Sequence, residues 1–146
     1  VVTHSLDIVG ALGGAAGITV ISTPGQYDAR EALLVGYETV AFLRSFAAHR
    51  AILGATGITE DGMSNAEVNA AAVYATMMAC AMRTTVVADH GKFGVRALKL
   101  YGGWGRDVDL VCDRPPPEPL AAAIERAGGR VLVAARAPAP AGVPAR

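Results

Sequence analysis

The chain has 146 residues, 52% of them hydrophobic and 18% charged, and its 13 basic residues balance its 13 acidic ones. This length suits one domain and is too short for two ordinary ones, and the apolar composition excludes a disordered or fibrous chain. The balanced charge leaves no electrostatic footprint for nucleic acid or an anionic membrane. Apolar runs stop well before the roughly 18 residues that a membrane-spanning helix needs, so we expect no membrane segment.

Apolar runs of strand length alternate with helical repeats along the chain. We expect strands at residues 1–3, 18–21, 51–55, 84–88, 108–112 and 130–134. We expect helices at residues 6–12, 37–48, 66–82 and 120–127. The segment 30–35 fits a short strand, although its Ala and Leu content leaves a helix open. Strands that alternate with helices through short loops predict an α/β domain with a mostly parallel sheet covered by helices.

The segment 66–82 is rich in Ala and Met and nearly devoid of charge. Ser64 and Glu67 have the spacing of a capping box, in which Ser64 would be the N-cap and Glu67 would reach back to it. A helix that is apolar all round is buried either within its own fold or in a subunit contact, and we favour the subunit contact. We therefore expect a homo-oligomer, either a dimer or a tetramer.

We expect residues 1–134 to form a single domain and residues 135–146 to form a Pro/Ala-rich tail that is extended or disordered. Cys80 and Cys112 lie in apolar contexts, so we expect two reduced and mostly buried thiols. Trp104, the only tryptophan, lies among glycines, where a packed or interfacial anchor is a better interpretation than stacking on a ligand.

Small and polar residues follow four of the predicted strands, in the segments THS (3–5), TPG (23–25), TGI (56–58) and DHGK (89–92). Ligands of open parallel sheets collect where strands end, and glycines let backbone N–H groups approach an anion. Lys92 supplies the only full cation among these four segments. The pattern predicts a pocket for a phosphorylated or otherwise anionic small molecule.

A metal site or a catalytic pair at these strand ends is less consistent with the sequence. His4, His49 and His90 have no Cys or carboxylate at ligand spacing, so we expect neither a metal nor another cofactor. Asp89 and His90 are adjacent residues that leave a strand in different directions, which disfavours an acid–base couple. We expect Asp89 to accept hydrogen bonds from N–H groups of its own loop.

Six segments in order carry a resemblance to a known family: VVTHSL, TPGQY, LLVGYETVAFL, AILGATGITEDGMSN, VVADHGKFG and VDLVCD. Together they resemble the C-terminal sensor domain of DeoR-type bacterial transcriptional regulators, from Val1 to about Ala134. The most specific piece is Asp89 followed by Lys92-Phe93-Gly94. The resemblance implies a fold like that of ribose-5-phosphate isomerase, glucosamine-6-phosphate deaminase and the CoA transferases.

The family uses this fold to sense sugar phosphates or related metabolites, so the resemblance implies a sensor and not an enzyme. By position it assigns effector binding to Thr3, His4, Gly25, Gly57, Ile58, Asp89 and Lys92. His4 stands where the family usually has Asn, and Pro24 replaces the first glycine of a Gly-Gly turn. The family also has a Lys in its long helix, where this chain has Tyr74.

The resemblance further implies a helix-turn-helix, and a phosphate loop of the form Asp-x-Gly-Ser/Thr-Thr, ahead of Val1. We therefore interpret the chain as part of a cytoplasmic repressor of carbohydrate metabolism that binds DNA only through a domain missing here. The alternative is an enzyme of the sugar-phosphate isomerase or deaminase type. Its carboxylate base would be Glu60 or Asp61, the only loop carboxylates near Gly57. A third alternative is a structural module without a ligand.

Overall fold

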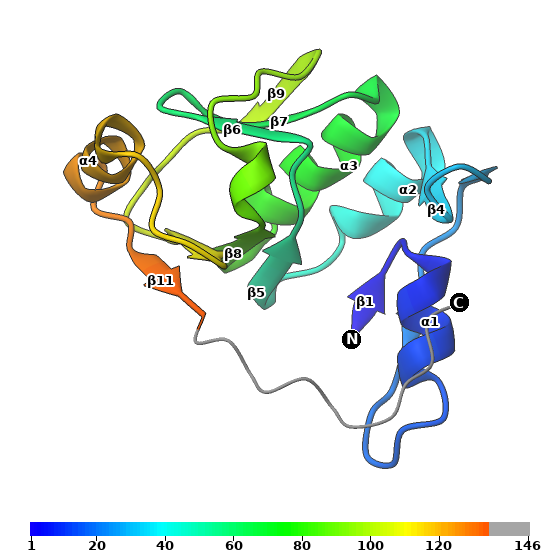
Figure 1. Ribbon diagram of the computed structural model, residues 1–146. Helices are drawn as coiled ribbons and strands as arrows, with labels where there is room; N and C mark the ends of the chain where they lie inside the picture. The colour runs from blue at the N-terminus through cyan, green and yellow to red at the C-terminus, as the bar shows by residue number, and fades with distance from the viewer. Residues whose placement is uncertain (135–146) are drawn as a thin grey trace, which may run out of the picture.

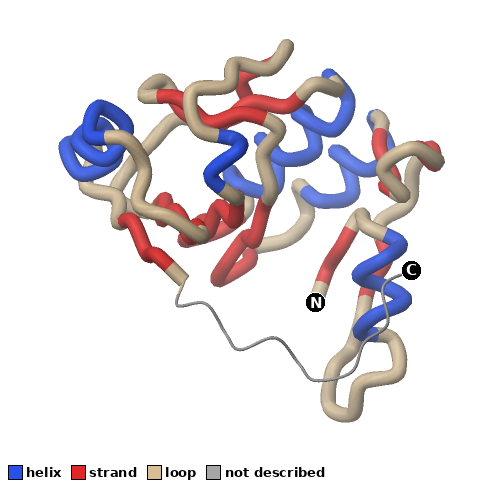
Figure 2. Tube along the Cα trace, viewed as in Figure 1, coloured by secondary structure: helices blue, strands red, loops and turns tan. Residues whose placement is uncertain are grey.

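The computed structural model describes residues 1–134, and the predicted tail at 135–146 lies outside the described residues (Figures 1 and 2). The strands are β1 Val2–Thr3, β2 Ile21–Ser22, β3 Gln26–Asp28, β4 Leu33–Val35, β5 Ala48–Leu53, β6 Gly57–Thr59, β7 Gly62–Asn65, β8 Ala81–Ala88, β9 Lys99–Gly102, β10 Val108–Cys112 and β11 Val131–Val133. The helices are α1 Leu6–Leu12, α2 Tyr37–Leu43, α3 Val68–Ala79, α4 Glu118–Arg126 and the short 3₁₀ helix η1 His90–Lys92.

A four-stranded parallel sheet in the order β11-β10-β8-β5, called the central sheet below, is the largest sheet among the described residues. This confirms the predicted parallel α/β architecture. In its register Leu110 lies beside Val86, and Val86 lies beside Leu53, so apolar side chains of three strands share one face. Strand β10 has the predicted bounds, because its sequence is a nearly continuous apolar run. Its one charged residue is Asp109, whose carboxylate accepts hydrogen bonds from Arg83 and Arg130.

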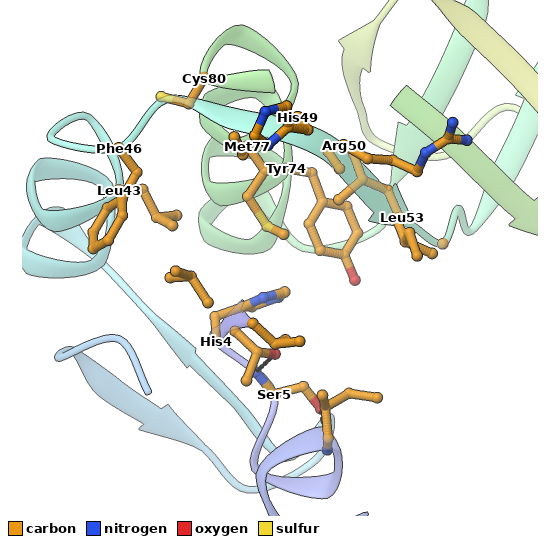
Figure 3. A pocket seen from close by; sticks show the side chains of 18 of the residues that line it. His4, Ser5, Leu43, Phe46, His49, Arg50, Leu53, Tyr74, Met77 and Cys80 are labelled. Atoms are coloured by element: carbon orange, nitrogen blue, oxygen red, sulfur yellow. Dashed lines mark hydrogen bonds between the residues drawn. The ribbon is translucent and has the colours of Figure 1, made fainter. Parts of the chain in front are cut away.

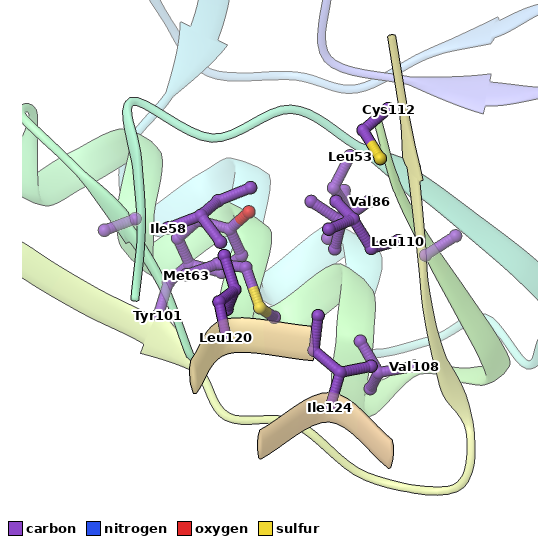
Figure 4. Packing of buried hydrophobic residues seen from close by; sticks show 12 residues of the cluster. Leu53, Ile58, Met63, Val86, Tyr101, Val108, Leu110, Cys112, Leu120 and Ile124 are labelled. Carbon is purple, nitrogen blue, oxygen red and sulfur yellow. The ribbon is translucent and has the colours of Figure 1, made fainter. Parts of the chain in front are cut away.

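Helices α3 and α4 cover this face and enclose the main core (Figure 4). Leu120 and Ile124 lie on one side of α4 at i and i+4, the helical spacing that points both side chains at the sheet. Both are at most 2% exposed. Gly128 ends α4 as the sequence predicts, with φ of +86°, a left-handed conformation that suits a residue without Cβ.

The opposite face of the same sheet carries apolar side chains that remain exposed in the described structure. Ile52 of β5 is 67% exposed, Val87 of β8 is 48% exposed and Leu132 of β11 is 46% exposed. Because side chains alternate along a strand, these residues share the face away from α3 and α4.

Residues 1–35 form a smaller unit beside the sheet (Figure 1). Strands β1 and β2 pair in parallel, and β3 and β4 form an antiparallel hairpin. A second hydrophobic cluster joins this unit to α2 and α3, and it contains Leu33, Val35, Leu43, Ala70 and Val73. Helix α1 has no buried residue of its own.

Several predicted boundaries are wrong, and pairing between strands explains the differences. The predicted helix at 37–48 ends at Leu43, because β5 begins at Ala48 and pairs with β8 from Ala81 onward. The same pairing ends α3 at Ala79, before the predicted 82. Of the predicted strand at 18–21 only Ile21 is strand, and β2 extends to Ser22, since these two residues lie opposite β1.

The predicted capping box is also wrong, because Ser64 is not the N-cap of α3. Ser64 lies in β7, where its hydroxyl donates to the Gly57 carbonyl at 3.2 Å and accepts from the Ala97 N–H at 3.0 Å. Strands β6 and β7 form a hairpin where we expected no strand, with β9 beside β7. Helix α3 starts after Glu67, and its buried face packs within this chain.

Among residues 1–134, none of the helices has the length and apolar character needed to cross a bilayer. Cys112 is buried, Cys80 is partly buried, and neither forms a disulfide, as the sequence predicts. Trp104 packs against the main core and donates its indole N–H to the Thr59 carbonyl at 2.9 Å, which confirms the predicted anchor.

Candidate functional site

A groove of about 760 Å³ lies between β1 with the start of α1 on one side and β5 on the other (Figure 3). Thr3, His4 and Ser5 line it from the exit of β1. The length of β5 from Ala48 to Leu53 lines the facing side, and Tyr74 of α3 contributes an aromatic ring between them. The groove therefore joins two strands that are far apart in the sequence.

His4 is the polar side chain at the centre of this groove (Figure 3). It is 6% exposed, and neither ring nitrogen has a hydrogen-bond partner among the described residues. Its ring meets that of Tyr74 edge to face, with centroids 5.4 Å apart. Burial lowers the pKa of His4 to about 4, so the imidazole is neutral near pH 7.

A neutral imidazole has one N–H donor and one acceptor nitrogen. Two unpartnered buried nitrogens are costly, at roughly 1–3 kcal/mol each, so a ligand that satisfied them would gain affinity. A hydroxyl group can accept from one nitrogen or donate to the other, which makes a polyhydroxyl compound a chemical match for His4.

Backbone contacts hold the exit of β1 in place around His4. The His4 carbonyl accepts from the Leu34 N–H at 2.7 Å, and the Thr3 carbonyl accepts from the Thr23 N–H at 3.0 Å. The Thr3 hydroxyl oxygen accepts from the Ser5 N–H at 3.1 Å. Thr3 thus fixes the turn that directs His4 into the groove.

Gly25 lies apart from the groove lining. Its φ of +144° and its close approach to Thr39 leave no room for a Cβ. The Thr39 hydroxyl donates to the Pro24 carbonyl at 2.7 Å. Packing therefore requires glycine at position 25, independently of any ligand.

Gly57 and Ile58 lie in β6 beside the loop that contains Lys92. Ile58 is fully buried in the main core, so its side chain is inaccessible to a ligand. Its carbonyl accepts from the Gly94 N–H at 2.8 Å, which joins β6 to the end of the η1 loop. A Cβ on Gly57 would collide with the backbone of Val95, so this position requires glycine.

Asp89 begins η1 and accepts a hydrogen bond from the Gly91 N–H at 2.8 Å, as the sequence predicts. Lys92 ends η1, and its backbone N–H donates to the Asp89 carbonyl at 3.1 Å. Within residues 1–134 the Lys92 ammonium forms no salt bridge, which leaves it available to an anion.

His90 and Asp113 form a pair that was not predicted from the sequence. The carboxylate of Asp113 accepts from the His90 backbone N–H and contacts its Nδ1, both at 2.7 Å. The hydrogen bond from His90 lowers the pKa of Asp113. Asp113 follows β10, the neighbour of β8, so parallel pairing brings the two loops together. The predicted strand order could have suggested this contact, although the interval of 23 residues hides it in the sequence.

The predicted effector residues thus form two groups in the structure, and Gly25 belongs to neither. Thr3 and His4 lie at the groove, whereas Gly57, Ile58, Asp89 and Lys92 lie around β6 and η1. Sequence reasoning missed three groove residues with polar atoms, Tyr74, His49 and Arg50. In the part of the chain described here, no three His, Cys, Asp or Glu side chains are grouped as they would be around a metal ion.

A parallel sheet with polar strand ends and a neutral histidine in a groove defines an α/β domain of the ligand-binding type. Residues 1–114 match the model of the family described as the DeoR C terminal sensor domain, and the chain belongs to this family. Its fold is accordingly of the sugar-isomerase-like class that the sequence resemblance implies.

Similar proteins are bacterial transcriptional regulators. The chain is 26% identical over 133 residues to the HTH-type transcriptional repressor GlcR of Bacillus subtilis, which covers 91% of this chain and 52% of that protein. It is 28% identical over 116 residues to the HTH-type transcriptional regulator IolR of the same species, covering 79% and 46%. It is 25% identical over 118 residues to the glycerol-3-phosphate regulon repressor of Escherichia coli, covering 80% and 47%. The chain spans about half the length of these relatives.

Proposed function

We propose that this chain is the effector-sensing and oligomerisation domain of a transcriptional repressor of carbohydrate metabolism. The effector is a phosphorylated sugar or a related anionic metabolite. The observation that carries the proposal is His4, a buried neutral imidazole that lines the groove and whose two nitrogens have no hydrogen-bond partner among the described residues. The names of the relatives support it, since one of them is a repressor of a glycerol-3-phosphate regulon.

In this proposal the residues at the groove recognise one part of the effector, and the residues around β6 and η1 recognise another part of the same molecule. His4 hydrogen-bonds to a hydroxyl group, and Lys92 supplies a cation for an anionic group. Effector binding favours one arrangement of subunits over another, and this shifts the DNA affinity of a helix-turn-helix elsewhere in the protein. The effector alters DNA binding only by as much as its affinity differs between the two arrangements.

A thermal-shift screen of the full-length protein tests this function. The panel contains glycerol 3-phosphate, glucose 6-phosphate and ribose 5-phosphate, each with its unphosphorylated counterpart as control. We expect one phosphorylated compound to raise the melting temperature, because a ligand at 100 times its Kd stabilises a protein by about 2.7 kcal/mol.

Two variants connect this response to the site. We expect Lys92→Ala to remove most of the stabilisation, whereas Lys99→Ala, which changes the only other lysine of the chain, retains it. Equal stabilisation of the Lys92→Ala and Lys99→Ala proteins would show that Lys92 does not bind the anion. A panel without any response would contradict the proposed class of effector.

The enzyme alternative finds less support in the geometry. Asp61 is 61% exposed at its side chain and pairs with Arg96 at 3.3 Å, so it faces solvent and a cation instead of an enclosed substrate. Isomerisation of ribose 5-phosphate or deamination of glucosamine 6-phosphate that disappears in Asp61→Ala would restore the enzyme alternative and overturn the sensor function.

A further inference from the structure

Strands β8 and β10 end side by side at the carboxyl edge of the central sheet, where Ala88 lies opposite Cys112. The residues that follow are Asp89 and His90 after β8, and Asp113 after β10. Ligands of open parallel sheets bind at this edge. His90 and Asp113 therefore lie where the fold places ligand contacts, although neither is among the predicted effector residues.

The carboxylate of Asp113 fixes the His90 ring. One of its oxygens accepts from the His90 backbone N–H, and the other contacts Nδ1 of the imidazole, both at 2.7 Å. The hydrogen bond from His90 lowers the pKa of Asp113, so this carboxylate is ionised near pH 7 and can only accept. Nδ1 must then carry the proton, and Nε2 is the nitrogen left for a ligand. Among residues 1–134 Nε2 forms no hydrogen bond, and the side chain is 47% exposed.

The charged groups around His90 come from two segments. Asp89 and Lys92 belong to its own loop, whereas Asp113 and Arg114 follow β10, with 4.0 Å between the Arg114 Nε and the Asp113 carboxylate. Strand β6 and the three residues that follow β5 contain no charged side chain. Both carboxylates already accept hydrogen bonds within the chain. The groups left for a ligand at this edge are therefore mainly donors.

We propose that His90 is a further anion-binding residue of the sensor, oriented by Asp113 and acting together with Lys92. The two residues begin and end the same three-residue turn, η1. Oxygens of a phosphate group on the effector accept from the Lys92 ammonium and from Nε2 of the protonated imidazole. The inference rests on the proposed function and adds to it a second donor for the anion.

The same arrangement makes anion binding depend on pH. A neutral His90 that donates from Nδ1 to Asp113 has no proton on Nε2, so it offers a lone pair to the phosphate instead of a donor. Histidine changes its charge between about pH 5 and pH 8. The His90 contact with phosphate is therefore present at the acidic end of this range and lost at the alkaline end.

Equilibrium titration of the full-length protein with inorganic phosphate tests this role. His90→Asn is the informative variant, because its amide can still donate to Asp113 from the place of Nδ1 and has no atom at the place of Nε2. We expect His90→Asn to raise the Kd roughly tenfold or more at about pH 6, through the loss of one charge-assisted hydrogen bond.

Arg126→Gln is the control for the loss of one cation. Arg126 ends α4, which leads into the start of β11, so it lies toward the amino edge of the sheet and away from η1. We expect it to change the Kd by less than about twofold, because exposed charges at such a separation are largely screened. Equal effects of Arg126→Gln and His90→Asn would reduce the role of His90 to net charge and overturn the proposal.

The pH dependence distinguishes a charged contact from a merely structural role. Phosphate itself titrates near pH 6–7, so the measured quantity is the ratio of the Kd of His90→Asn to that of the unmodified protein, in which this titration cancels. We expect the ratio to be roughly tenfold or more at about pH 6 and to approach one at about pH 8. The lowered pKa of Asp113 keeps its carboxylate ionised throughout. A ratio that is the same at both pH values would overturn the proposal.

Nitrogen NMR of the histidine rings measures the contact in the unmodified protein. Phosphate should shift the Nε2 signal of His90 and leave Nδ1, which Asp113 holds, nearly unchanged. The signal is assigned by its absence from His90→Asn or, if that variant does not fold, from His90→Gln. An Nε2 signal that stays in place at saturating phosphate would overturn the proposal.

These outcomes separate the role of His90 from the proposed function. If Lys92→Ala abolishes phosphate binding and His90→Asn leaves it unchanged, the sensor keeps its cation and the role of His90 is wrong. If His90→Asn weakens binding and Lys92→Ala does not, the two residues do not share a site, which contradicts the joint role. A full-length protein that does not bind phosphate at all would contradict both proposals.

Discussion

His4 illustrates at the scale of a single residue how burial sets chemical character. The ring is held between β1 and Tyr74, where a charged imidazolium would lose its hydration without gaining a partner. The protein therefore keeps His4 neutral near pH 7, as a hydrogen-bonding group and not as a cation. The positive charge for an anion has to come from another residue, and Lys92 is the candidate.

The low pKa of His4 predicts a pH dependence of stability. The unfolded imidazole titrates near 6.5 and the folded one at about 4, so between these values only the unfolded state binds the proton. Stability that is present above pH 6.5 is therefore lost as the pH falls toward 4, by roughly 3 kcal/mol. Urea unfolding at pH 7 and pH 4.5 measures this loss.

The non-titrating variant His4→Asn is the control for this pH dependence. It keeps a polar side chain at the position and removes the imidazole, so we expect a smaller loss of stability between the two pH values. Groups elsewhere in the protein titrate equally in both proteins and cancel in the comparison. Parallel pH profiles of the two proteins would show that His4 does not stay neutral in the folded state.

At the scale of the element, the hairpin of β6 and β7 depends on the glycine with which β7 begins. Gly62 has a φ of +131°, and a Cβ at this position would collide with the Gly102 carbonyl of the neighbouring β9. Both the backbone conformation and the close approach of β9 therefore require glycine.

We expect Gly62→Ala to lower the free energy of unfolding by more than about 2 kcal/mol, because it combines backbone strain with a steric clash. Gly14→Ala is the control, since Gly14 has no neighbour near the position of a Cβ and no positive φ, and we expect a change within about 0.5 kcal/mol. Denaturant unfolding measures both. Similar effects of the two substitutions would contradict the role assigned to Gly62.

The elements that the sequence predicts best are those with continuous apolar runs, such as β10. Residues 48–50 and 81–83 contain charged or polar side chains, and they become strand only because the two segments pair with each other. A local pattern cannot show that pairing. The same limit applies to the site, where the polar strand ends were predictable but the contact between His90 and Asp113 depends on the strand order.

At the scale of the whole molecule, the two hydrophobic clusters differ in size and in position. The main core joins the central sheet to α3 and α4, whereas the smaller cluster attaches residues 1–35 to α2 and α3. The smaller cluster contains five buried residues against twelve in the main core, and α1 adds none, so less apolar surface opposes the opening of this unit. We infer that residues 1–35 open before the central sheet does.

Hydrogen exchange in two core variants tests this order of opening. We expect Leu110→Ala to accelerate exchange of the Val86 amide roughly 30-fold or more, without affecting the Leu34 amide, which donates to His4. Leu110 stays buried while residues 1–35 open, so its loss does not change that step. Leu33→Ala should accelerate both amides, because Leu33 is exposed in either opening. Faster hydrogen exchange of the Leu34 amide in the Leu110→Ala protein would mean that the molecule opens as one unit.

Trp104 gives the protein a built-in optical reporter. The indole N–H is fixed to the Thr59 carbonyl at the end of β6, and the ring packs on the main core. Because the chain has one tryptophan, its emission comes from this place alone. A shift of the hairpin that exposed the indole to water would move the emission to longer wavelength, so movements of β6 could be followed by fluorescence without attaching a label.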